Sequence, residues 1–213
     1  MEHNEFDPAQ EGDKPLDINS REQRSESNFR LDVLSYLHDI VYTLAGVLLV
    51  FLLLFRIVIV NGPSMRDTMV HGDYVILINN IFYHEKHPGD IVVVSKDSYK
   101  DGEPIIKRII ATQGQQVDID FANGTVFVDG SALDEPYIKT ATNLYEGITF
   151  PLTVDEGCYF VMGDNRNESK DSRSTEIGLV DNREILGKAV FLLLPGRNPD
   201  TGKYEFNRIG VLP

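Results

Sequence analysis

The sequence predicts a mostly β fold, in which a domain of antiparallel β-sheets follows one N-terminal transmembrane helix. Three observations support this prediction. One apolar run covers Ile40–Val60, the pattern after Asn61 changes to short β-like runs separated by turn signals, and no long amphipathic helix follows. We therefore expect an acidic tail over residues 1–39, a membrane span over residues 40–60 and a β-rich domain over residues 61–213.

The N-terminal tail is polar and acidic. Most of residues 1–39 lacks hydrophobic periodicity, and Pro8 and Pro15 lie among many Asp, Glu, Asn and Ser residues. Such a composition cannot bury enough apolar surface to offset the conformational entropy lost on folding, so we expect a mostly disordered tail. A short amphipathic stretch, Leu31–His38, leads from this tail toward the helix.

The apolar run Ile40–Val60 contains a single charge, Arg56. At a rise of about 1.5 Å per residue, a helix of this length spans roughly 32 Å, enough to cross a hydrocarbon core of about 30 Å. Arg56 lies near the end of the run, from where its long side chain can reach the polar interface. The run starts late in the chain and exceeds the apolar core of a cleaved signal peptide, so we expect a permanent anchor.

Basic residues are biased toward one side of this run. Arg21, Arg24 and Arg30 precede it closely, whereas only Arg66 follows within a similar distance. Cytoplasmic flanks of membrane spans carry the excess of Lys and Arg. We therefore expect a single-pass protein of the cell membrane with a cytoplasmic N-terminus and an extracytoplasmic β-rich domain.

Short β-like runs fill most of the chain after Asn61. Two of them flank Asn123-Gly124, which is a strong hairpin signal. The runs are Tyr74–Ile78, Ile91–Ser95, Pro104–Ala111, Val117–Phe121, Thr125–Val128, Cys158–Met162 and Lys188–Leu194.

Charge and cysteine content exclude several classes of protein. The formal net charge of −13 and the pI of about 4.7 argue against a nucleic-acid-binding protein with a basic face. Cys158 is the only cysteine, so the chain can form neither an intramolecular disulfide nor a zinc site built on several thiolates.

The first candidate catalytic motif lies just after the apolar run. Gly62 and Pro63 favour a sharp turn that presents Ser64. A serine in such a loop is not by itself a sign of catalysis. Met65 and Met69 in the same loop either dip into the bilayer or belong to the core.

The second motif is the run Pro104–Ala111, which contains Lys107. Along a strand, Ile105 and Ile109 share a face with Lys107. A lysine in apolar surroundings has a lowered pKa, because burial disfavours its charged form. Lys107 is therefore a candidate general base, unless this is an edge strand whose lysine points to solvent; the neighbouring Arg108 stays protonated and cannot be the base.

The third motif, Gly163–Arg173, places two Asp/Arg alternations and two serines in a short loop after an apolar run. Such a loop can stabilise itself with Asp–Arg pairs and supply hydroxyl groups to a nearby site. The alternative is a solvated polar loop without catalytic function.

Together the three motifs closely resemble those of the type I signal peptidases. That family carries a serine box just after a membrane anchor, a lysine-arginine box on a strand and a G-D-N-R-x-x-S-x-D-S-R box, in the order found here. The resemblance covers roughly Ile40–Leu194 and implies a fold of the signal-peptidase type. By matching position it implies that Ser64 is the nucleophile, Lys107 the general base and Ser169 the hydroxyl that orients this lysine. It also implies that the ion-pairing side chains supporting the site are Asp164, Arg166, Asp171 and Arg173.

Some positions depart from the family pattern. Asp67 and Met69 stand where many members have Pro and Leu, and Ala111-Thr112-Gln113-Gly114 replaces a tighter turn. Gly62 stands where some members have a serine whose hydroxyl stabilises the oxyanion. The oxyanion would then depend on the backbone N–H of Ser64 and on a second donor that the sequence does not identify.

The resemblance implies a serine endopeptidase that removes signal peptides from secreted preproteins through an acyl-enzyme. The substrates would carry small residues at the −1 and −3 positions, and membrane lipid would be the other partner. No cofactor, metal or nucleic acid is expected.

Other interpretations remain open at this point. A sortase-like transpeptidase would need an activated Cys158, and a self-cleaving repressor protease shares the Ser–Lys chemistry but has no membrane span. A membrane-anchored, non-catalytic β-domain is the third. Two metal sites are further alternatives. One is a histidine pair, His84 and His87, which is otherwise a pair of surface residues; the other is a Ca²⁺ site formed by Asp118, Asp120 and Asp129, which otherwise form the solvated face of a strand.

Overall fold

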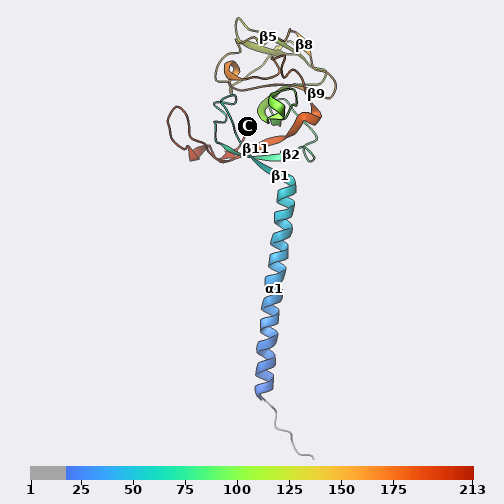
Figure 1. The fold of residues 1–213 in the computed structure, drawn as a ribbon, viewed down its shortest axis with the longest axis vertical. Helices are drawn as coiled ribbons and strands as arrows, with labels where there is room; N and C mark the ends of the chain where they lie inside the picture. Colours follow the sequence, from blue (N-terminus) through green and yellow to red (C-terminus); the bar gives the residue numbers. More distant parts are fainter. Residues whose placement is uncertain (1–17) are drawn as a thin grey trace, which may run out of the picture. The chain divides into compact units, whose positions relative to one another are not determined.

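The computed structural model describes the backbone of residues 18–213 and the side chains from Asp32 onward (Figure 1). The chain divides into two compact units, one ending at Val50 and the other covering Phe51–Pro213. The described part of the first unit, from Ile18 onward, is helical, and the second unit is built mainly of β-strands, so the predicted fold class is confirmed.

One helix, α1 (Ile18–Leu54), contains the apolar segment. Its part from Asp32 to Leu54 is long and apolar enough to cross a membrane, with a mean hydropathy of 2.2 in its most apolar stretch. Large apolar side chains along it, such as Leu44, Leu48 and Leu52, are exposed. An exposed apolar surface of this length is stable in a bilayer and costly in water.

The boundaries of this helix differ from the prediction at both ends. Phe55–Ile59 forms a strand and not the end of the span, because its β-branched residues pair with a neighbouring strand and satisfy their backbone groups there. Residues 18–39 are helical and not a disordered tail, since no proline or glycine interrupts the chain between Ile18 and Ala45. The rest of the predicted tail, residues 1–17, lies outside the described residues.

Two antiparallel sheets form the second unit. The larger sheet has the strand order β1-β2-β11-β3-β4-β9-β10, with β12 also paired to β11, and the smaller sheet has the order β7-β6-β5-β8. In Figure 1, β5 and β8 lie at the opposite end of this unit from β1 and β2. The strands are β1 (Phe55–Ile59), β2 (Tyr74–Asn79), β3 (Ile91–Val94), β4 (Ile105–Thr112), β5 (Gln116–Asp120), β6 (Thr125–Val128), β7 (Ser131–Ala132), β8 (Leu152–Thr153), β9 (Cys158–Met162), β10 (Val180–Asp181), β11 (Ile185–Leu194) and β12 (Gly210–Val211).

All of the predicted β runs are strands in the structure, and the predicted hairpin joins β5 to β6. Gly124 in its turn has a φ of +72°. The carboxylate of Asp120 accepts hydrogen bonds from the backbone N–H groups of Ala122 and Asn123, which closes the turn. The strands that were not predicted are β1 and the four strands of two residues, which are too short to show a period.

One hydrophobic core cluster contains side chains from several strands and from the loop between β1 and β2. Met65 and Met69 of this loop are 1% and 0% exposed and pack with Val75, Leu77 and Ile106. The two methionines are therefore core residues and do not reach the bilayer.

Candidate active site

Ser64 lies in the loop between β1 and β2, which we call the Ser64 loop (residues 61–73). The loop is closed at its base, where Val60 N–H donates to Asp73 O and Gly72 N–H donates to Val60 O, both at 2.9 Å. Met65 anchors it in the core immediately after Ser64. Ser64 itself is half-buried, so its hydroxyl is held at a fixed place and stays accessible.

Lys107 lies on β4, a central strand that pairs with β3 on one side and β9 on the other. The strand is therefore not an edge, and the side chain of Lys107 is 2% exposed. Its Nζ lies 3.0 Å from Ser64 Oγ and donates to Ile106 O at 2.9 Å. The structure thus brings together the two residues proposed from the sequence as nucleophile and base.

Burial lowers the pKa of Lys107 to about 8, because the charged amine loses its hydration. The carboxylates of Asp171 and Asp164 oppose this shift, whereas the positive charge of Arg173 adds to it. A substantial fraction of Lys107 is therefore neutral near pH 8 and able to accept a proton.

Asp164 links three parts of the site. It forms a bidentate ion pair with Arg108, with Nε–Oδ1 and Nη2–Oδ2 distances of 2.9 and 2.7 Å. Both side chains are almost completely buried, and the guanidinium of Arg108 also lies over the ring of Tyr137. Thr68 Oγ1 in the Ser64 loop donates to Asp164 Oδ2 at 2.5 Å. Asp164 therefore joins the Ser64 loop to the strand that carries Lys107.

Asp171 and Arg173 form the second buried ion pair, with two N–O distances of 2.8 Å. Asp171 Oδ2 also accepts a hydrogen bond from Gly163 N–H at 3.0 Å. A Cβ at Gly163 would lie 2.5 Å from Ser64 O and 2.2 Å from Ser169 Oγ, so this position must be glycine for the two loops to approach. The close approach lets Asn165 N–H donate to Ser64 O at 2.9 Å.

The third motif does not pair within itself as fully as its sequence suggested. Arg166 forms an ion pair with Glu135, far from the motif in sequence, and donates to Thr142 Oγ1 at 2.8 Å. The sequence did not predict either Glu135 as the partner of Arg166 or Arg108 as the partner of Asp164. The isoleucines that flank Arg108 indicate that its side chain is buried and needs a charged partner, but nothing around Glu135 indicates a partner.

Ser169 is buried beside Gly163, at 3% exposure. Its Oγ has no hydrogen-bond partner among the described residues, so the structure contains no hydrogen bond between Ser169 and Lys107. The orienting role of Ser169 stays a prediction.

Gly62 adopts a φ of +98°, a conformation that glycine tolerates without strain. Its N–H points to His71 Nδ1 at 3.4 Å. By contrast, the N–H of Ser64 makes no hydrogen bond within the part of the chain that the structure describes. Of these two N–H groups, that of Ser64 is the one free to bind a substrate oxygen.

A small cavity of about 40 Å³, lined by both polar and apolar groups, lies beside Ser64. It can hold a group little larger than a water molecule or a methyl group. The lining residues are Val58, Ile59, Val60, Asn61, Ser64, Met65, Val93, Pro104 and Ile106.

The alternative sites lack comparable geometry. Cys158 is only half-buried, and desolvation and nearby carboxylates, Asp181 first among them, raise the pKa of its thiol. An activated cysteine needs a lowered pKa, so a sortase-like mechanism is disfavoured.

The carboxylates proposed for a metal site have other roles. Those of Asp120 and Asp129 accept hydrogen bonds that shape the β5–β6 hairpin. Among the described residues, no group of three His, Cys, Asp or Glu side chains is placed to hold a metal ion.

Comparison with known proteins gives consistent matches. The sequence model of "Signal peptidase, peptidase S26" matches residues 33–194. The chain is similar to a signal peptidase I of Bacillus licheniformis, with 29% identity over 81% of this chain and 95% of the relative. It is 34% identical to a signal peptidase I of Bacillus amyloliquefaciens, over 73% of this chain and 82% of the relative. A crystal structure of a signal peptidase I from Enterococcus faecalis V583 is 30% identical, covers 49% of this chain and 96% of that chain, and has a TM-score of 0.41.

Proposed function

The chain belongs to the signal peptidase family, peptidase S26, and from that premise we propose that it removes signal peptides by means of a Ser64–Lys107 dyad. It is a serine endopeptidase, and its family acts on secretory preproteins. The observation that carries the proposed dyad is the 3.0 Å contact between Ser64 Oγ and the buried Nζ of Lys107.

The reaction begins with proton transfer. Neutral Lys107 takes the proton of Ser64 Oγ, which attacks the scissile carbonyl and forms a tetrahedral oxyanion. Collapse of this intermediate breaks the peptide C–N bond, and the Lys107 ammonium returns the proton to the leaving amine. Lys107 then removes a proton from water, which attacks the acyl-enzyme and releases Ser64 with its own proton restored.

The Ser64 N–H is the donor we assign to the oxyanion, since it has no partner within the described residues. Removing one such donor typically costs about 3 kcal/mol of transition-state stabilisation. Gly62 has no side chain to add a second donor, and its N–H already points to His71.

The cavity beside Ser64 supports a preference for small residues at the −1 position of the substrate. Its volume of about 40 Å³ matches an alanine methyl group, and its walls are the packed side chains of Val93 and Ile106. We place the −1 side chain there; for the −3 residue the support is the family resemblance.

A preprotein with Phe in place of Ala at −1 is expected to be cleaved at least about 100-fold more slowly, because the larger side chain must displace packed core residues. Cleavage would be measured by gel mobility and N-terminal sequencing of the product. A matched preprotein with Ser at −1 is the control and should be cleaved at nearly the original rate. Equal cleavage of the Phe and Ala substrates would contradict the assignment of this cavity.

Anchoring by α1 and an extracytoplasmic active site complete the proposal. The apolar residues up to Leu54 support a single membrane span, and the excess of arginines before it supports a cytoplasmic N-terminus. Ser64 follows the helix by only ten residues, so the chain keeps the nucleophile near the membrane surface, where the cleavage site of a preprotein emerges.

The rate of cleavage is expected to increase with pH through an apparent pKa of about 8, the pKa of Lys107. The neutral amine is the active form, so kcat/KM falls about tenfold per pH unit well below this value. The measurement is kcat/KM against pH, with thermal melting at each pH as the control for folding. An acid limb near pH 6.5 would instead indicate a histidine as the base.

The direct test of the function uses the full-length protein in detergent with a secretory preprotein. Cleavage after a small residue at the end of the signal peptide is the expected result. If the folded protein cleaves no preprotein, a membrane-anchored, non-catalytic β-domain becomes the better description.

A further inference from the structure

The C-terminal segment (residues 195–213) lies beyond the residues that match the family and has no part in the mechanism above. It leaves β11, runs past the Ser64 loop and returns to pair with β11 as β12. After this return, Leu212 packs against the core cluster that holds Met65 and Met69. The segment is thus packed onto the element that carries the nucleophile.

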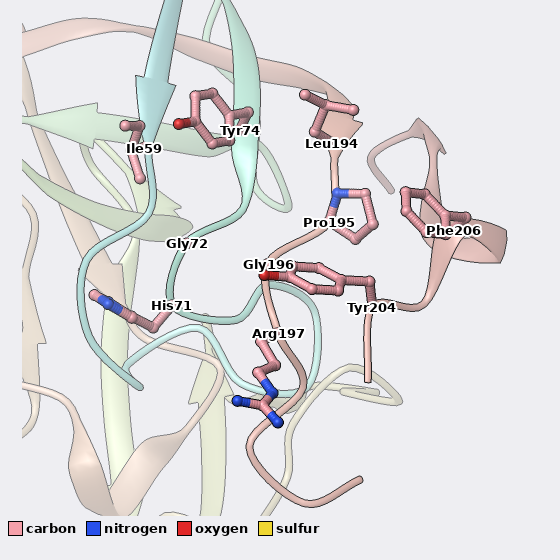
Figure 2. A pocket seen from close by; sticks show the side chains of 10 residues that line it. All are labelled: Ile59, His71, Gly72, Tyr74, Leu194, Pro195, Gly196, Arg197, Tyr204 and Phe206. Atoms are coloured by element: carbon pink, nitrogen blue, oxygen red, sulfur yellow. The ribbon is translucent and has the colours of Figure 1, made fainter. Parts of the chain in front are cut away.

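Gly196 is where the segment crosses the Ser64 loop. Figure 2 shows it beside Gly72 and His71, next to a cavity of about 550 Å³. Its N–H donates to Asp73 Oδ1 at 2.6 Å. A Cβ at this position would lie 2.3 Å from His71 O, so a close approach of the two backbones requires glycine here.

Arg208 makes the second connection. Its Nη1 and Nη2 lie 3.1 and 2.7 Å from the two carboxylate oxygens of Asp73, and Nη2 also donates to Thr68 O at 3.3 Å. Asp73 is completely buried and accepts a further hydrogen bond from Val70 N–H at 2.8 Å. One guanidinium therefore holds two points of the Ser64 loop at once. A second ion pair, between Arg66 and Asp200, joins the same two segments at the surface.

The contacts continue from this loop to the general base. Thr68, whose carbonyl accepts from Arg208, uses its hydroxyl to donate to Asp164. Asp164 forms the bidentate pair with Arg108, the neighbour of Lys107 on β4. An unbroken series of hydrogen bonds thus runs from the C-terminal segment through the Ser64 loop to the strand of the base.

We propose that Arg208 is a positioning residue, which acts through Asp73 and Thr68 to hold Ser64 Oγ within hydrogen-bond distance of Lys107 Nζ. The inference rests on the proposed function, since it assigns a role in the same reaction. Proton transfer between Ser64 and Lys107 depends on the distance between the two groups. A displacement of about 1 Å in the reacting groups can lower a rate about 100-fold.

The kinetic test compares Arg208→Ala with Arg183→Ala. Arg183 makes an equally bidentate pair with Asp181, but on the surface and outside the site. We expect Arg208→Ala to lower kcat by about 100-fold with KM changed less than about threefold. The acid limb of its pH profile should move to higher pH, because a loosened loop admits water to Lys107 and raises its pKa. Arg183→Ala should match the wild type in all three quantities.

Hydrogen exchange of the Ser64 loop provides a readout that does not depend on activity. In the Ser64→Ala background, Arg208→Ala should speed exchange of the backbone amides in residues 64–73, and Arg183→Ala should not. If the wild type cleaves no preprotein while this difference is found, the proposed function fails and the positioning contact stands.

Two outcomes would overturn the inference. One is an Arg208→Ala protein with a lowered Tm but wild-type kcat, pH profile and loop exchange, which is the behaviour of a purely structural contact. If Arg208→Ala does not fold, Arg208→Lys and Thr68→Val are tested in its place, since neither changes the net charge of the protein. Both are expected to lower kcat, and Arg208→Lys should lower it less. Wild-type kcat in both variants is the second outcome that would overturn the inference.

Discussion

Replacing Ser64 with Ala is expected to abolish preprotein cleavage, with kcat/KM lowered by about 10⁴- to 10⁶-fold. The variant keeps the cavity and the Ser64 N–H but has no atom that can form the acyl-enzyme. Lys107→Ala should be about as severe, because the hydroxyl then has no group to accept its proton. The double variant should be no worse than either single one, since the two residues act as a unit.

Single-turnover cleavage of a preprotein by the full-length variants in detergent would measure this loss. Cys158→Ser is the matched control and should retain wild-type activity, since the pKa of this thiol is raised and not lowered. Thermal melting should show that all four proteins are folded. Residual cleavage by Ser64→Ala above about 1% of the wild-type rate would exclude Ser64 as the nucleophile.

The largest expected loss of stability follows from replacing Arg108 with Ala. Asp164 is 0% exposed and would remain as an unpaired charge in the protein interior. Removing one partner of a buried ion pair typically costs about 3–5 kcal/mol in the free energy of unfolding. The packing of the guanidinium on Tyr137 and its hydrogen bond to Gly89 O would be lost as well.

Urea unfolding of the domain measures this change, and Arg183→Ala again provides the control. Its pair with Asp181 has similar distances, but Arg183 is 87% exposed, so the urea midpoint should hardly change. The double variant Arg108→Ala/Asp164→Ala should regain part of the lost stability, because no buried charge is then left unpaired. A small effect of Arg108→Ala alone would show that the site does not depend on this pair.

Most strands of the domain could be predicted from the sequence, because turn residues bound them and their apolar residues cluster. The end of the helix could not be predicted in this way. Leu54 and Phe55 lie within one continuous apolar run, and hydropathy alone does not distinguish a short apolar strand from the end of a membrane helix. The β-branched residues after Arg56 favour a strand, and their pairing with β2 is what makes this segment a strand and not the end of the helix.

The Ser64–Lys107 pair could be proposed from the resemblance of the three motifs taken together, because the isoleucines flanking Lys107 fit burial but do not by themselves exclude a lysine that points to solvent. The ion pairs around it could not be assigned in the same way. Two alternating Asp and Arg residues suggested pairing inside one loop, yet Asp164 pairs with Arg108, which lies 56 residues away. Partners at such separations are set by the folded sheet and leave no periodic trace in the chain.

The burial of Lys107 has a consequence for the inactive protein. With a pKa of about 8 in the fold against an unperturbed 10.5, its protonated form destabilises the folded state by roughly 3 kcal/mol at neutral pH, a deficit that disappears as the pH rises from 8 to 10.5. An apolar residue of similar length, as in Lys107→Met, removes this penalty together with the activity. Such a chain would be more stable at neutral pH than the working enzyme. The same burial that makes Lys107 able to accept a proton therefore lowers the stability of the active protein.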